Sequence, residues 1–235
     1  MSLNRAPSQE KARSAVSLHV ENAMDMYQQL VAGLVPDPQE CLQKAEALKA
    51  AYPKDSPERL AERAVSQAKK LLAVAGAGTG LVANPMAAAP LALAEAGIVL
   101  RSEAKMAGVV AALLEPTVLQ DTDAFTADIM SIVFPSAASQ ALREFTVRAG
   151  QATTKTLIRK YISKDVLKAL VRFAAKYLGL KLTQRALITK AVPLVGAVIG
   201  AVWNWSEVKL VGNRAIQYYR NENIHEPEPG EPGQV

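Results

Sequence analysis

The sequence predicts an all-α protein, folded as a single compact domain of several helices around a core rich in glycine and alanine. Apolar residues recur at helical spacing through most of the chain, whereas the alternating β-branched runs typical of strands are scarce. Two uncharged stretches, residues 71–94 and 191–205, contain many small residues that let helix backbones approach closely. With 235 residues, half of them hydrophobic, the chain can bury one substantial core.

Capping residues and prolines divide this chain into its helices. Ser56 and Pro57 supply a side-chain cap and a first-turn proline for one helix, Ser163 caps another, and Pro116 ends a long one. Three further residues are expected to interrupt the last apolar segments: Gly179, Pro193 and Gly212. Helices are expected at residues 9–34, 38–51, 57 into the glycines at 76–80, 84–114, 122–133 and 136–149, as a basic pair within 151–178, and in a final segment ending near 221.

The two ends of the chain differ in composition from its middle. Residues 1–8 are polar and residues 224–235 are rich in Pro, Gly and Glu, so we expect both ends to be disordered around a helical domain at 9–223. No secretory signal pattern precedes the first helix, and Cys41 is the only cysteine, which fits a reducing compartment. We therefore expect a cytoplasmic protein, which could also lie peripherally at the inner membrane.

The usual signatures of catalytic chemistry are missing. The two histidines, His19 and His225, are far apart, and no Glu-x-x-His pair or serine nucleophile motif occurs. The sequence therefore predicts no metal and no cofactor, and a non-enzymatic role is the main hypothesis. An enzyme with an unrecognised carboxylate-based site remains the alternative, together with a purely structural interaction module.

Glycine-rich segments are expected to form close helix contacts. The run G-A-G-T-G at 76–80 follows a helical pattern and lacks the Gly-Lys-Ser/Thr ending, so it does not predict a phosphate-binding loop. The uncharged stretch at 71–94 is long enough to span a bilayer, but its Ala and Gly content and the break at Pro85 favour a buried helical hairpin. The residues expected at close contacts are Gly76, Gly78, Gly80, Gly196, Gly200 and Gly212.

Four polar residues are candidates for the core or for contact with a ligand headgroup. Glu95 is surrounded by apolar residues three and four positions away, so its carboxylate needs a cation, hydrogen-bond donors or a proton. Structural pairing with Arg101 or Arg214 is the simpler interpretation, and contact with a ligand headgroup is the functional one. Asn204, in the second uncharged stretch, completes the set.

A basic stripe marks the segment with the strongest charge asymmetry. Residues 148–190 contain many Lys and Arg but a single acid, Asp165, although the net charge of the whole chain is only +5. Lys164, Lys168, Arg172 and Lys176 recur every four residues, so they share one helix face, opposite a face formed by Val166, Leu170, Phe173 and Tyr177. Such a stripe is either a solvated outer face or a surface for anionic lipid. No recognised motif indicates nucleic acid.

Two segments of the chain resemble the EcsC family of bacterial proteins. They are residues 76–108 and 191–220, beginning GAGTGLVANP and AVPLVGAVIG. The matching positions are Gly76, Gly78, Gly80 and Glu95 in the first segment and Pro193, Gly196, Gly200, Asn204, Gly212 and Ala215 in the second. The first segment departs from the family pattern, because Asn84 and Pro85 stand near an expected glycine pair and the usual Tyr-Gly is missing. The family takes its name from an operon encoding an ABC-type transporter linked to secretion, so the resemblance implies a role near envelope transport.

The sequence thus favours a non-catalytic helical protein that associates with a membrane surface or binds a lipid-like ligand. The expected partners are an anionic membrane surface or lipid and, through the resemblance, a component of a transporter. Four residues are expected to bind the anionic surface: Lys164, Lys168, Arg172 and Lys176.

Overall fold

The computed structural model confirms the all-α class. It describes residues 25–79, 85–144, 154–191 and 196–220, and within these ranges it describes the side chains except those of 73–79, 85–95, 154, 181–191 and 196–205. Every regular element in these ranges is a helix. The predictions for residues 1–8, for the start of the first helix and for the tail at 224–235 lie outside them.

The described elements follow one another with short connections. A helical segment at residues 25–32 precedes the labelled helices. These are α2 (Pro38–Ala51), α3 (Pro57–Thr79), α4 (Pro85–Leu114), the 3₁₀ helix η1 (Pro116–Gln120), α5 (Thr122–Val133), α6 (Pro135–Glu144), α7 (Thr154–Tyr161), α8 (Lys164–Ala191) and α9 (Gly196–Tyr219).

Side-chain caps mark the starts of α2, α3, α5 and α8. The Asp37 carboxylate accepts a hydrogen bond of 2.7 Å from the Gln39 backbone N–H at the start of α2, and Asp121 caps α5 in the same way. The hydroxyls of Ser56 and Ser163 each accept a backbone N–H at 3.3 Å, which confirms these two predicted caps.

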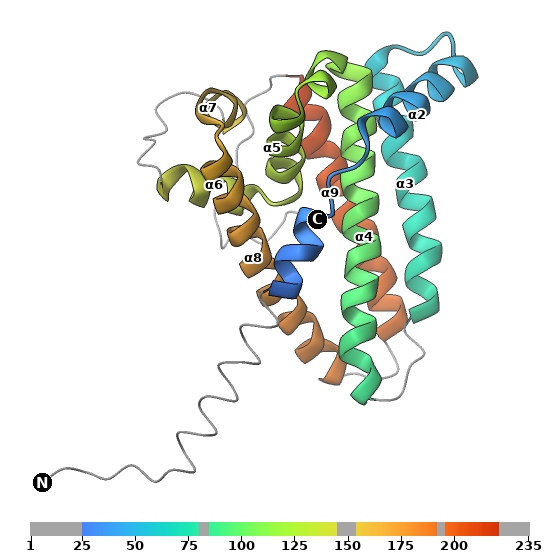
Figure 1. Cartoon of the computed structure of the whole chain (residues 1–235). Coiled ribbons are helices and arrows are strands. Elements are labelled where there is room, and N and C mark those ends of the chain that lie inside the picture. Colours follow the sequence, from blue (N-terminus) through green and yellow to red (C-terminus); the bar gives the residue numbers. More distant parts are fainter. Residues whose placement is uncertain (1–24, 80–84, 145–153, 192–195, 221–235) are drawn as a thin grey trace, which may run out of the picture.

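The helices pack in two groups that meet at α4 and α5. In one group α3, α4 and α9 lie against one another, with α2 across α4. In the other, α6 packs against α8, and α5 contacts both groups (Figure 1). The core contains many alanines, among them Ala104, Ala107 and Ala111 on α4. Because alanine is small, it allows the close helix crossings that the sequence predicts.

Two predicted helix breaks are wrong. Gly179 lies inside α8 and Gly212 inside α9, so neither ends a helix. Both are instead sites of close packing: a Cβ at Gly179 would lie 3.0 Å from the Tyr27 ring, and one at Gly212 would lie 2.5 Å from Val65 Cγ1. A glycine inside a helix costs up to about 1 kcal/mol relative to alanine. In these two helices the contact with a neighbouring side chain explains why glycine is present.

Candidate functional site: a basic face on α8

The basic face of α8 consists of Lys164, Lys168, Arg172 and Lys176, all of which are exposed. The opposite face of the helix points into the protein. Val166 and Leu170 are buried there, while Phe173 and Tyr177 are half-buried against the core. The helix is therefore amphipathic in the sense that the sequence predicts, with its cations in contact with solvent.

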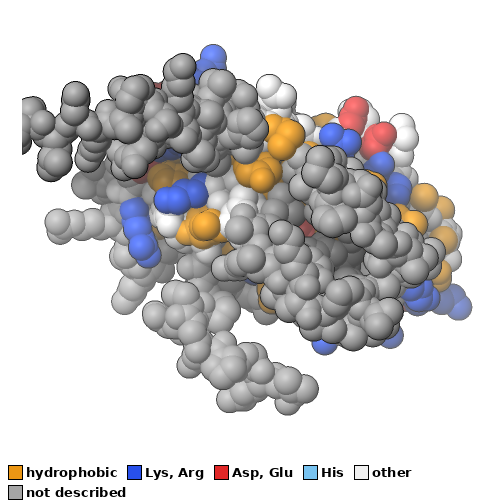
Figure 2. Space-filling view, turned by 90° about the horizontal axis from the view of Figure 1, so that it is seen from below, with side chains coloured by type: hydrophobic (Ala, Val, Ile, Leu, Met, Phe, Trp, Pro, Cys, Tyr) orange, Lys and Arg blue, Asp and Glu red, His pale blue; other side chains and the backbone are white. Residues whose placement is uncertain are grey.

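In sequence, exposed apolar side chains flank the basic face on both sides. Leu180 continues the four-residue spacing after Lys176 and is 53% exposed, and Tyr161, just before α8, is 42% exposed. The ammonium of Lys160 lies 5.4 Å from the centroid of the Tyr161 ring. Seen from below, Lys and Arg side chains lie beside hydrophobic ones on the molecular surface (Figure 2). Cations flanked by exposed apolar and aromatic residues are typical of helices that lie at a membrane interface.

The four cations of the basic face are not equally available. Arg172 forms an ion pair with Glu144 of α6, and Lys168 Nζ lies 3.9 Å from the Asp165 carboxylate, with both side chains largely exposed. Lys164 and Lys176 form no ion pair with any residue that the structure describes. Exposed pairs of this kind are weak, so they reduce the positive charge of the face without removing it.

Packing against three other helices holds α8 in place. It contacts α4, α5 and α6. The Gln140 amide donates a hydrogen bond of 2.5 Å to the Tyr177 hydroxyl, joining α6 to α8. The basic face is therefore presented by a helix that the core fixes in position.

The candidate core polar residues are only partly described, and those that are described do not come together. The side chains of Glu95 and Asn204 lie outside the described part of the chain. Arg101 is exposed on α4, which corrects the expectation that it lies in the core: it shares the outer face of the helix with exposed Ile98, three residues earlier. Arg214 is half-buried and donates from Nη1 to the Ile132 carbonyl at 2.8 Å. It thereby satisfies a carbonyl in the last turn of α5.

Among the glycines expected at close contacts, Gly212 is the one whose surroundings lie within the described residues. It is buried, and Val65 of α3 occupies the space next to its Cα. The surroundings of the other five lie outside the described residues: Gly76, Gly78, Gly80, Gly196 and Gly200.

A buried charge cluster, which the sequence analysis did not identify, joins four elements. It consists of Glu115, Asp128, Lys155, Arg159 and Tyr218. Glu115 accepts hydrogen bonds from Lys155 Nζ at 2.6 Å and from Arg159 Nη1 at 2.5 Å. Asp128 is paired with Arg159 through both carboxylate oxygens, and its Oδ1 accepts the Tyr218 hydroxyl at 2.7 Å. The cluster therefore ties α7 to the end of α4, to α5 and to α9.

Burial and pairing shift the ionisation of this cluster. Burial raises the pKa of Asp128, against the hydrogen bonds from Arg159 and Tyr218, which lower it. Burial also opposes ionisation of Glu115, but the hydrogen bonds from Arg159 and Lys155 prevail and its pKa falls below the usual range. The pKa of Tyr218 is raised by burial and by the negative charge of Asp128. Such a network holds elements in register, and removing one member leaves another buried charge without compensation.

Asp128, in the buried charge cluster, is closed to a substrate, whereas Glu115 and Arg159 are each 27% exposed. The Asp128 side chain is 0% exposed, and its oxygens are occupied by Arg159 and Tyr218. Within the described residues, no group of three or more His, Cys, Asp and Glu side chains is placed to hold a metal ion. One sequence signal could have found the cluster: Asp128 lies among apolar residues of a helix, as Glu95 does, and needs a partner for the same reason.

None of the helices in the described part of the chain combines the length and the apolar composition needed to cross a bilayer. Comparisons of the chain with protein-family models, with curated proteins and with solved structures return no match.

Proposed function

We propose that the protein associates peripherally with anionic membranes through the basic face of α8. The observation that supports this most is the combination of four exposed cations on one helix face with exposed Leu180 one turn after the last cation and exposed Tyr161 three residues before the first one in sequence. Lysine and arginine are attracted to anionic headgroups, while an exposed leucine and tyrosine can enter the interface.

The expected strength of this association is moderate. A cation near an anionic membrane surface contributes about 1 kcal/mol. Because Arg172 is paired with Glu144 and Lys168 lies near Asp165, the basic face supplies less than four full contributions. The association should therefore be reversible and should weaken as salt screens the charges.

The cellular context is suggested by the resemblance of the sequence to the EcsC family. That resemblance supports an accessory role near an ABC-type transporter or secretion system, with a transporter component as a protein partner. It is consistent with a peripheral membrane protein that performs no catalysis.

Vesicle co-sedimentation tests the membrane proposal. The parent protein should bind vesicles of mixed phosphatidylglycerol and phosphatidylcholine at low salt, and it should bind pure phosphatidylcholine weakly. The double change Lys168→Glu and Lys176→Glu should weaken anionic binding by at least about tenfold, because Lys176 contributes about 1 kcal/mol, Lys168 contributes a smaller amount beside Asp165, and acids replace both.

The matched control carries the same charge change elsewhere. Lys54 and Lys70 are exposed, lie outside α8 and form no ion pair with any described residue, so Lys54→Glu with Lys70→Glu should retain most of the binding. Equal loss in both double variants would mean that only net charge matters. A parent protein that ignores anionic vesicles at low salt would contradict the proposal outright.

A further inference from the structure

A pocket opens between α2, α3 and α4, away from the basic face. Its volume is about 490 Å³, within the range of about 300–1,000 Å³ that is usual for small-molecule sites. In Figure 1, α4 separates α3, on the pocket side, from α8. The residues that line the pocket are Lys44, Ala47, Leu48, Ala51, Tyr52, Ala64, Gln67, Ala68, Leu71, Ser102, Lys105, Met106 and Val109.

Small residues at helical spacing create the hollow. Ala47 and Ala51 lie one turn apart on α2, and Ala64 and Ala68 lie one turn apart on α3. Since methyl groups cannot fill the space between three helices, a cavity remains between these walls. Buried Leu48, Met106 and Val109 add further apolar surface.

One wall of this apolar pocket carries an exposed leucine. Leu71 on α3 lines the pocket and is 65% exposed, the largest value among the exposed large hydrophobic side chains of the described residues. At the end of α2, the Tyr52 ring is held by the Arg63 guanidinium, which lies 3.9 Å from the ring centroid. The pocket therefore has a positioned aromatic wall and an apolar side chain that is open to solvent.

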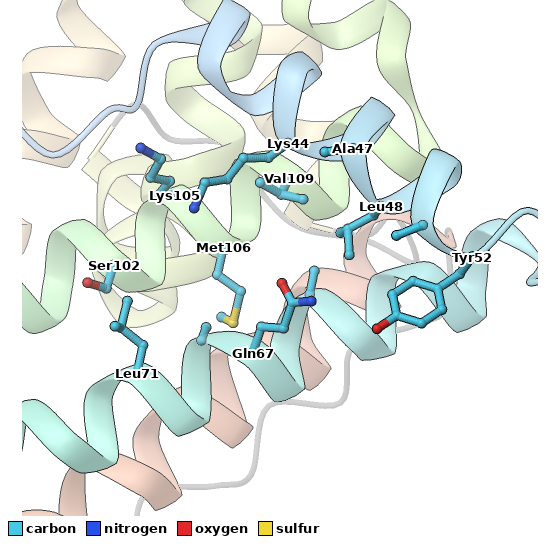
Figure 3. A pocket seen from close by; sticks show the side chains of 13 residues that line it. Lys44, Ala47, Leu48, Tyr52, Gln67, Leu71, Ser102, Lys105, Met106 and Val109 are labelled. Carbon is cyan, nitrogen blue, oxygen red and sulfur yellow. The ribbon is translucent and has the colours of Figure 1, made fainter.

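The charged groups of the pocket are two cations, with no acid among the lining residues, and Tyr52, Gln67 and Ser102 add neutral polar groups. Lys44 from α2 and Lys105 from α4 lie along the same edge, and Gln67 and Leu71 of α3 lie across from them (Figure 3). Lys105 is paired with exposed Glu40 just outside the pocket, whereas Lys44 forms no ion pair with any described residue. The pocket thus combines an apolar interior with a positive edge.

We infer that this pocket binds a single-chain amphiphile with an anionic head, the chain lying against Leu48, Leu71 and Met106 and the head at Lys44 and Lys105. Since Lys105 already pairs with Glu40, a neutral apolar ligand would leave the Lys44 ammonium without an anion, and a small anion would leave the apolar walls uncovered. This inference goes beyond the proposed membrane association, because it concerns a molecule that is taken out of water into a separate site.

Isothermal titration calorimetry tests the inference with three probes, and the two that carry an alkyl chain are used below their critical micelle concentrations. Dodecyl phosphate should bind with a stoichiometry of one. Dodecylphosphocholine, which has the same chain and a zwitterionic head, should bind at least about tenfold more weakly, and inorganic phosphate should not bind measurably. Equal affinity for both chain-bearing probes would overturn the role of the lysines. Binding of inorganic phosphate as tight as that of dodecyl phosphate would overturn the role of the apolar walls.

Three variants place the ligand in the pocket. Lys44→Glu should weaken dodecyl phosphate binding at least about tenfold, whereas the matched exposed change Lys54→Glu should alter it by less than about twofold. Ala47→Trp, at an exposed position on the wall, should fill the space and weaken both chain-bearing probes. A thermal melt confirms that each variant folds. The inference is wrong if Lys44→Glu and Lys54→Glu behave alike, or if Ala47→Trp binds as the parent does.

A fourth variant separates the two proposals. Lys168→Glu with Lys176→Glu should bind dodecyl phosphate as tightly as the parent does, even though it loses anionic vesicles. If that variant loses dodecyl phosphate as well, the amphiphile is binding at the basic face and the pocket is not its site.

Discussion

The close contact between Gly212 of α9 and Val65 of α3 is a sensitive point of the helix packing. A Cβ at position 212 would lie 2.5 Å from Val65 Cγ1, 2.7 Å from Cγ2 and 3.1 Å from Cβ. Carbon atoms pack at about 3.5–4.0 Å, so Gly212→Ala forces α9 away from α3 by roughly 1 Å. Both residues are buried, which leaves the new methyl group no solvent to turn into.

The expected cost follows from two opposing terms. Overpacking a core lowers the free energy of unfolding by about 1–3 kcal/mol, whereas replacing a helical glycine by alanine raises it by up to about 1 kcal/mol. Gly212→Ala should therefore destabilise the protein by about 1–2 kcal/mol, or lower Tm by roughly 2–8 °C for a chain of this size. In a Val65→Ala background the two Cγ contacts are gone and only the 3.1 Å approach to the Cβ of residue 65 remains, so the same change should be close to neutral. The double-mutant cycle should give a coupling of about 1–2 kcal/mol.

Urea or thermal unfolding of the four proteins measures this coupling. Gly33→Ala is the control, because a Cβ there meets no atom closer than 3.5 Å, and it should leave Tm unchanged or slightly raised. A coupling near zero, or a stabilising Gly212→Ala in both backgrounds, would show that α9 and α3 do not meet at this distance.

The buried charge cluster yields two further predictions. Asp128→Ala should lower the free energy of unfolding by about 3 kcal/mol. This is the lower end of the usual range for breaking a buried pair, because Arg159 keeps Glu115 as a partner. A loss below about 1 kcal/mol in urea unfolding would contradict this prediction. Glu115→Gln should be destabilising at pH 7, and because the folded-state pKa of Glu115 is lowered from 4.5, the difference from the parent should shrink as the pH falls below that value and through the folded-state pKa. A difference that grows towards acid pH would refute the assigned pairing.

Local signals explain why many helix boundaries could be predicted. The expected helices at 38–51 and 122–133 have the bounds of α2 and α5. The prolines and caps that begin these helices act within one turn, so they can be recognised without knowledge of the fold. The end of α4 at Leu114, two residues before Pro116, has the same local origin.

The predicted breaks at Gly179 and Gly212 failed because the reason for glycine is not local at either position. Tyr27 and Val65, which occupy the space beside them, are more than 140 residues away in sequence. A sequence shows that a glycine is present, but it does not show whether the backbone turns there or a distant side chain needs the room.

The basic face and the buried charge cluster show, within one charged segment, that a sequence does not reveal contacts with distant residues. Four-residue spacing was sufficient to place Lys164, Lys168, Arg172 and Lys176 together on α8. Lys155 and Arg159 belong to the same basic run, yet the cluster pairs them with acids 31 to 44 residues earlier. Spacing along a helix identifies a shared face, whereas distant partners decide whether that face meets solvent or the core.

The pocket could not be read from the sequence for a related reason. Its alanines lie on α2 and α3, and the sequences of these helices do not show where the two helices move apart. Lys44 and Lys105 line the same pocket only because α2 packs across α4. The space between three helices depends on their relative orientation, which no short motif encodes.

The most direct test of the membrane proposal is the fluorescence of a probe attached at Leu180, beside the basic face. Leu180→Cys can be labelled selectively, because the native thiol of Cys41 is fully buried and burial raises its pKa to about 12. With an environment-sensitive fluorophore at position 180, anionic vesicles should produce a blue shift that salt reverses. The same fluorophore at exposed Ala50, on α2, should respond little. An unchanged spectrum at position 180, or equal shifts at both positions, would contradict the claim that α8 faces the membrane.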